Sequence, residues 1–171
     1  MAPGAEGLGS VKPHWWRGTR GEWYVVVQVG LITLVLLGPR TGPGWPEWTP
    51  PWTALARGAA GVLLVAGSLL CLGGALKLGA NLTPLPYPTD RAALVETGAY
   101  RVVRHPMYCG VLALTLSWAL WRRGWLTLAY AGLAFAFLNL KSRREERWLC
   151  ARFPAYADYQ RRVRRLIPFV Y

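Results

Sequence analysis

Residues 106–140 read PMYCGVLALTLSWALWRRGWLTLAYAGLAFAFLNL, and this stretch sets the architecture of the chain. Its only charged residues are Arg122 and Arg123, which separate two apolar runs of 16 and 17 residues. Runs of this length lie at the short end of the roughly 17–25 residues that cross a bilayer as a helix. The stretch therefore predicts two membrane-spanning helices joined by a tight turn.

Two more uncharged stretches precede this hairpin, at residues 23–39 and 58–76. The first is rich in valine and would suit a strand in water, but in lipid only a helix satisfies its own backbone polar groups. The second contains small residues that allow close helix packing, such as Gly61, Gly67 and Gly74. We therefore predict an all-α integral membrane protein with about four transmembrane helices.

Composition supports a membrane protein. Hydrophobic residues make up 53% of the 171 residues and charged residues only 16%, yet the net charge is +12. An apolar chain with excess cations suits a membrane whose cytoplasmic face is anionic, and ten tryptophans suit its interfaces. This balance argues against a disordered chain and against a polar nucleic-acid-binding surface. The three cysteines are far apart and odd in number, so we expect free thiols and no metal site.

The positions of Lys and Arg predict the topology, because these residues favour the cytoplasmic side of a membrane. With four crossings both termini are cytoplasmic, and the short chain, rich in Gly, Arg and Trp, suits a prokaryotic inner membrane. The predicted segments are a cytoplasmic or interfacial N-terminus (1–21), two transmembrane helices (22–76), a cytoplasmic loop (77–105), the hairpin (106–140), and a cytoplasmic Glu-Glu helix with a basic amphipathic tail (141–171).

Two polar clusters flank the hairpin, one at residues 98–110 and the other at residues 141–149. If the hairpin forms, both clusters meet at the same membrane surface. Pro106 suits the first position of a helix, whose N-terminus favours an anionic group beside Arg104 and His105. The alternatives are that these side chains anchor the helix at the interface, and that Lys141 pairs with a glutamate on a solvated helix face.

The C-terminal tail combines a basic charge with an aromatic stripe. Residues 141–171 hold nine Lys or Arg against three acidic residues, a net charge of +6. Its aromatic and apolar residues recur at helical spacing, at Phe153, Tyr156, Tyr159 and Val163. We predict an amphipathic helix that lies on anionic lipid headgroups and does not bind nucleic acid.

The motifs of the C-terminal half occur in an order that resembles one family. Residues 94–100 (LVETGAY) precede residues 104–110 (RHPMYCG), which are followed by Glu145-Glu146, Tyr156-x-x-Tyr159 and Leu166-Ile-Pro168. This pattern resembles the isoprenylcysteine carboxyl methyltransferase family and its bacterial and archaeal relatives. The resemblance covers nearly half of the chain. It implies an integral membrane enzyme that uses S-adenosylmethionine (SAM). The implied cofactor site lies between the cytoplasmic loop 77–105, the start of the hairpin and the Glu-Glu helix.

The resemblance also implies site residues. Family members carry a basic residue, usually expected to be Arg, that orients the acceptor, and Lys141 occupies that position here. The resemblance implies that Lys141 and Arg104 are the catalytic residues. The implied acceptor is lipophilic, either the carboxylate of an isoprenylcysteine-like compound or another lipid-like molecule. The implied cofactor-binding residues are Leu94, Val95, Tyr100, His105, Pro106, Met107, Tyr108, Glu145 and Glu146.

Two other functions remain open from the sequence. Membrane sterol reductases are similar in this C-terminal region and use NADPH, whose 2′-phosphate would need several cations. A non-catalytic membrane adaptor could use the basic tail to dock partners. The binding of S-adenosylhomocysteine or of NADPH separates the three functions.

Overall fold

The computed structural model describes residues 22–79 and 94–171, and those residues form helices joined by loops. The predicted N-terminal segment and residues 80–93 of the predicted cytoplasmic loop lie outside the described residues. The all-α class is confirmed for the described part. Its elements are α1 (Glu22–Leu37), α2 (Trp52–Leu78), the short 3₁₀-helix η3 (Gly98–Arg101), α3 (Pro106–Arg122), α4 (Trp125–Arg152) and α5 (Tyr156–Arg162).

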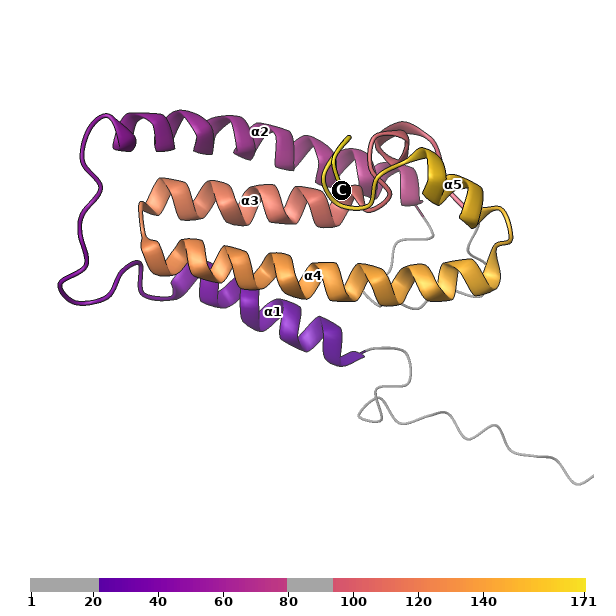
Figure 1. The fold of residues 1–171 in the computed structure, drawn as a ribbon, viewed down its shortest axis with the longest axis horizontal. Coiled ribbons are helices and arrows are strands. Elements are labelled where there is room, and N and C mark those ends of the chain that lie inside the picture. Colours follow the sequence, from indigo (N-terminus) through magenta and orange to yellow (C-terminus); the bar gives the residue numbers. More distant parts are fainter. Residues whose placement is uncertain (1–21, 80–93) are drawn as a thin grey trace, which may run out of the picture.

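The long helices lie side by side in one bundle (Figure 1). Helix α3 lies between α2 and α4, and α1 packs against α4 on its other side. The α1–α2 connection and the α3–α4 turn share one end of the bundle, which we call the loop end (residues 38–51 and 122–126). Helix α5 and η3 share the other end, which we call the α5 end (residues 96–108 and 141–171).

Helix α2 is the one helix of the described residues that is both long and apolar enough to cross a membrane. It has 27 residues, or about 40 Å at 1.5 Å per residue. Helix α1 is apolar but has only 16 residues. The four helical stretches predicted from the sequence are all present, whereas the number of membrane crossings stays a prediction.

Apolar side chains point outward along the first two helices, as expected of surfaces that face lipid. Only a small share of the α2 span is buried within the protein. Exposed apolar patches of this size mark contact with a membrane or with another protein. The exposed residues include Val26, Val27, Val29, Leu36 and Leu37 on α1 and Leu55, Val62, Leu64, Val65, Leu69, Leu72 and Leu76 on α2.

Glycines bring α2 and α3 into backbone contact. A Cβ atom at Gly67 would lie 2.9 Å from the carbonyl oxygen of Gly110, and a Cβ at Gly74 would lie 2.9 Å from Met107. The prediction of close packing at these two α2 glycines is confirmed. Gly61 faces open space and has no part in the contact.

The α3–α4 turn is as tight as predicted. Arg123 adopts a left-handed conformation (φ 52°) at the end of α3, and α4 begins after Gly124. Helix α4 then runs for 28 residues, about 42 Å, which exceeds the roughly 30 Å hydrocarbon core of a bilayer. The predicted Glu-Glu helix is therefore no separate element. It is the end of α4 beyond Leu140.

The prediction of a lipid-bound amphipathic tail is wrong for its aromatic stripe. Helix α5 has only seven residues, and Tyr156 and Tyr159 are each 2% exposed. The Tyr159 hydroxyl donates to the backbone oxygen of Tyr100 at 2.6 Å, so this face packs onto η3. Helical spacing identifies an apolar face, but it cannot distinguish a face that covers lipid from one that covers protein.

Candidate functional site

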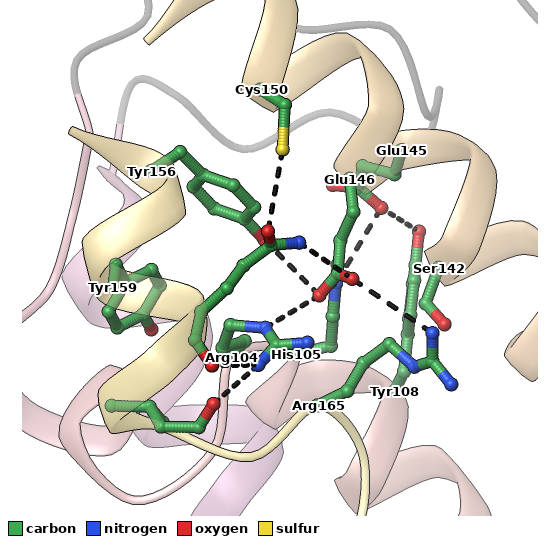
Figure 2. Close-up of polar contacts among 12 residues, drawn as sticks. Arg104, His105, Tyr108, Ser142, Glu145, Glu146, Cys150, Tyr156, Tyr159 and Arg165 are labelled. Carbon is green, nitrogen blue, oxygen red and sulfur yellow. Dashed lines mark hydrogen bonds and ion pairs between the residues drawn. The ribbon is translucent and has the colours of Figure 1, made fainter. Parts of the chain in front are cut away.

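The two polar clusters predicted on either side of the hairpin meet at the α5 end (Figure 2). The Tyr108 hydroxyl, one turn into α3, donates to Glu145 Oε2 at 2.9 Å. His105 lies between the two glutamates of α4, with Nδ1 3.7 Å from Glu145 Oε2 and Nε2 3.3 Å from Glu146 Oε1. The His105 and Tyr108 rings stack with their centroids 5.3 Å apart. This convergence is the central geometric expectation from the sequence, and it is confirmed.

Glu146 is the centre of the cluster, and its carboxylate is held by several side chains. Arg104 Nε donates to Oε1 at 2.6 Å, the Tyr156 hydroxyl donates to Oε1 at 3.3 Å, and Gln160 Nε2 donates to Oε2 at 3.2 Å. Burial would raise the pKa of Glu146, but the hydrogen bonds and positive charges of His105 and Arg104 outweigh it and lower the pKa to about 2. Glu146 is thus an anion held inside the protein.

Arg104 ties this centre to the C-terminal segment. Its Nη1 donates to the backbone oxygen of Gln160 at 3.0 Å and to the backbone oxygen of Val163. Its backbone amide donates to the oxygen of Arg164 at 2.7 Å. A guanidinium presents several donors in a fixed plane, which suits it to join one carboxylate and two carbonyls. These contacts favour a positioning role for Arg104 over the catalytic role implied by the resemblance.

Glu145 has a different environment from its neighbour. Within the described residues its hydrogen bond and its ion pair both go through Oε2, and its side chain is 24% exposed. Burial raises the pKa of Glu145, and the opposing effects of His105, Tyr108 and Lys141 do not cancel that shift. A partly accessible carboxylate that is costly to ionise is suited to receive a cationic ligand.

Lys141, on α4, is buried against α1 and Tyr108. It is 1% exposed, and its ammonium donates to Gln28 Oε1 at 2.6 Å. The ammonium also lies 5.1 Å from the centroid of the Tyr108 ring, within range of a cation–π contact. The alternative of a solvated helix face therefore does not hold for Lys141. Its position beside Tyr108 and Glu145 is compatible with the predicted role near an acceptor.

The other predicted cofactor-binding residues lie around the same end. Tyr100 and Pro106 are buried, whereas Met107 is half-buried beside Gly74 of α2. Leu94 and Val95 are half-buried at the start of the second described segment. Tyr100, Pro106 and Met107 belong to the α5 end, whereas Leu94 and Val95 directly precede it in the chain, and the cofactor-binding role of all five stays a prediction.

Sequence reasoning missed three polar partners of the site. Gln28 is the one polar amide within an apolar helix, a position that often carries function and could have been flagged. Gln160 and Arg165 belong to the tail that the sequence predicts to face lipid, but both approach Glu146, and Arg165 Nη1 lies 3.9 Å from Glu146 Oε2. No periodic signal distinguishes these two residues from the neighbouring tail residues.

Across residues 22–79 and 94–171, no group of three His, Cys, Asp or Glu side chains is placed to hold a metal ion. The acidic and imidazole groups at the α5 end contact one another and cationic side chains.

Comparisons with known proteins match this chain to one family and to two bacterial relatives. The sequence profile of the Phospholipid methyltransferase (PEMT) family matches residues 56–155, which include the α2–α3–α4 core and both glutamates. The cobalt-zinc-cadmium resistance protein CzcN of Cupriavidus metallidurans is 30% identical over 154 residues, 86% of this chain and 62% of CzcN. The nickel-cobalt-cadmium resistance protein NccN of Alcaligenes xylosoxydans xylosoxydans is 33% identical over 153 residues, 86% of this chain and 63% of NccN.

These matches place the resemblance seen in the sequence within a wider group. The family that matches is related to the isoprenylcysteine carboxyl methyltransferases, and the narrower assignment stays a prediction. The chain spans somewhat less than two thirds of the length of the two resistance proteins. Their names describe resistance to metals and name no reaction.

Proposed function

The chain belongs to the phospholipid methyltransferase family, and from this membership and the geometry of the α5 end we propose that it is a membrane methyltransferase. In this proposal it transfers a methyl group from SAM, the methyl donor of the family, to a lipophilic acceptor. The observation that carries the proposal is the contact between Tyr108 and Glu145, because it joins the two polar clusters and leaves Glu145 partly accessible.

The residues at the α5 end fit the charges of the cofactor. The amino-acid portion of SAM carries an ammonium and a carboxylate, and its ribose carries hydroxyls. Glu145 would bind the ammonium or the ribose hydroxyls, since its Oε1 makes no hydrogen bond or ion pair within the described residues. His105 and the first turn of α3 would favour the carboxylate, because a helix N-terminus attracts anions.

When bound, SAM supplies a sulfonium methyl group that is open to in-line attack. The contribution of the protein is then mainly alignment, which can supply about 7–11 kcal/mol of the barrier. Lys141 would orient the attacking atom of the acceptor, because its ammonium lies between Gln28 and the Tyr108 ring. The lipid-facing surfaces of α1 and α2 suit the entry of an acceptor with an apolar tail.

Binding of S-adenosylhomocysteine, the product of the cofactor, tests this function directly. We expect the full chain, purified in detergent, to bind it in a calorimetric titration. Glu145→Gln should lower the affinity by about tenfold or more, since a hydrogen bond to a charged group contributes roughly 1.5–3 kcal/mol. Asp158→Asn is the matched control, because it removes an exposed carboxylate of α5 that pairs with the exposed Arg161.

The same titration distinguishes the alternatives. Binding of NADPH without S-adenosylhomocysteine would favour a reductase, and binding of neither would favour an adaptor. Equal affinities for the wild type and Glu145→Gln would contradict the role given to Glu145 even if the cofactor binds.

A further inference from the structure

The loop end carries a polar pocket. This end lies opposite the α5 end along the bundle (Figure 1). Its volume is about 180 Å³, well above the 10–15 Å³ or so that holds one water molecule. Both connections of the loop end contribute to it, the α1–α2 loop and the α3–α4 turn. The lining residues are Arg40, Thr41, Pro46, Glu47, Trp48 and Arg123.

Three residues that line this pocket each carry a buried hydrogen-bond donor that has no acceptor within the described residues. Thr41 Oγ1, Trp48 Nε1 and Arg123 Nε each lack a hydrogen-bond partner within the described part of the chain. Buried donors are almost always paired in folded proteins, and each one left unpaired costs free energy. Three such donors around one pocket therefore indicate a ligand that brings several acceptor atoms.

The pocket walls are held in place by contacts between the two connections. The backbone amide of Leu126 donates to the oxygen of Arg40 at 3.1 Å, and Trp125 Nε1 donates to the oxygen of Pro46 at 2.9 Å. The rings of Trp48 and Trp125 pack with centroids 5.2 Å apart. A Cβ on Gly124 would lie 2.2 Å from the Arg40 oxygen, so the turn fits closely against the loop. The donors are thus fixed in position before any ligand arrives.

The charge of the pocket favours an anion. Arg40 and Arg123 supply two cations against the single carboxylate of Glu47, which lies 3.8 Å from Arg40 and is 86% exposed. A phosphate group offers several acceptor oxygens and binds guanidinium groups through paired hydrogen bonds. We propose that this pocket binds a phosphate group, carried either by a lipid headgroup or by a free phosphate. The site would lie at the membrane surface opposite the one that holds the methyl-transfer site.

Two probes that share this chemistry test the proposal. The full chain, purified in a neutral detergent without phosphate buffer, is titrated with inorganic phosphate and with dioctanoyl phosphatidic acid. Dioctanoylglycerol has the same acyl chains without the phosphate and serves as the lipid control. We expect at least one phosphate probe to bind by calorimetry and to raise the melting temperature, and the control lipid to do neither. Binding of both probes identifies free phosphate as sufficient, and binding of the phosphatidic acid alone identifies a headgroup site.

Variants of the lining residues predict effects of opposite sign. Arg123→Gln should weaken binding by about tenfold, and Trp48→Phe should weaken it by a smaller factor, because each removes a buried donor. Glu47→Gln should strengthen binding, because it removes the one acidic side chain among the described residues that line the pocket. Arg57→Gln makes the same change of charge as Arg123→Gln on an exposed α2 residue and should change the affinity by less than about twofold.

Several outcomes would overturn the proposal. These are the absence of binding by both phosphate probes, equal stabilisation by dioctanoylglycerol, and equal effects of Arg57→Gln and Arg123→Gln. Melting curves without ligand identify any variant that fails to fold. If Arg123→Gln does so, Trp48→Phe and Glu47→Gln still carry the test, because their opposite signs cannot arise from a general loss of structure.

Discussion

The two ends of the bundle use similar residues in different ways. At the α5 end, the donors of Arg104, Tyr156 and Gln160 converge on the carboxylate of Glu146, so the protein supplies its own anion. At the loop end, the buried donors of Thr41, Trp48 and Arg123 meet no acceptor within the described residues. The difference teaches that buried donors stabilise the fold where the chain supplies a counter-charge, and the donors left without one at the loop end are those that we propose bind a ligand.

The same contrast recurs between two neighbouring residues at the α5 end. Glu146 contacts side chains of α3 and α5 and has a pKa lowered to about 2, whereas the pKa of Glu145 is raised and its side chain remains partly exposed. Glu146 therefore joins α4 to α3 and α5, whereas Glu145 is the glutamate that we propose binds the ligand. The predictions below test these two contrasts.

The largest effect should come from Glu146. Glu146→Gln leaves Arg104 buried without its counter-charge. Removing one partner of a buried ion pair lowers the free energy of unfolding by about 3–5 kcal/mol. Glu145→Gln should cost much less, because burial already opposes the ionised form of that group. Chemical denaturation of both variants in detergent measures the difference. Equal losses of unfolding free energy would show that the two glutamates do not differ in role.

A smaller effect should come from the contact between α1 and α4. Gln28→Leu removes the acceptor of a 2.6 Å hydrogen bond from the buried Lys141, and hydrogen bonds to charged groups contribute about 1.5–3 kcal/mol. If Lys141 orients the acceptor, the variant should raise the KM for the acceptor and leave the affinity for S-adenosylhomocysteine unchanged. Gln28→Glu, which keeps an acceptor oxygen, should restore stability. If Gln28→Leu is as stable as the wild type, the hydrogen bond between Lys141 and Gln28 does not contribute to stability.

The loop end should respond to packing. Gly124→Ala places a Cβ 2.2 Å from the Arg40 oxygen, and such overpacking costs about 1–3 kcal/mol. The change should also weaken phosphate binding, because it separates the two connections that line the pocket. Gly58→Ala is the matched control, since a Cβ at Gly58 meets no atom within 4 Å. Thermal unfolding with and without phosphate compares the two variants.

The smallest expected effect is a change of affinity with pH. The pKa of Glu145 is raised from 4.5, so the carboxylate is protonated over a range where a normal glutamate is ionised. The ammonium of S-adenosylhomocysteine favours an ionised partner, so the affinity should rise with pH up to the folded-state pKa of Glu145 and then level off. By contrast, the pKa of Glu146 is lowered to about 2, so its stabilising contribution is complete above 4.5 and is lost only as the pH falls toward 2.

Titrations at a series of pH values from 4.5, the ordinary pKa of the group, upward measure this dependence, because the pKa of Glu145 is raised from that value. The Glu145→Gln variant should lose the part of the dependence that this carboxylate contributes. An identical pH profile in the wild type and in the variant would remove Glu145 from the proposed cofactor site.

Much of the fold follows from the chain alone, because an apolar run that enters lipid has few options. The stretches at 23–39, 58–76 and 106–140 predicted where α1 to α4 lie, although α2 begins six residues before its stretch and α4 continues for twelve residues beyond Leu140. The meeting of His105 and Tyr108 with the two glutamates also followed, since a tight hairpin returns the chain to the side from which it started. These features depend on local composition and on one short connection.

Long-range packing settled the remaining features. Nothing in the spacing of Tyr156 and Tyr159 tells whether that face covers lipid or protein, because both surroundings accept an aromatic ring. Likewise, the roles of Glu145 and Glu146 depend on which neighbours Arg104 and α5 bring to each carboxylate. The donors of the loop end became a candidate site only when residues about 80 positions apart, Thr41 and Arg123, were seen to line one pocket. Composition fixes which segments are helical, whereas the pairing of buried charges depends on contacts between segments that no local pattern encodes.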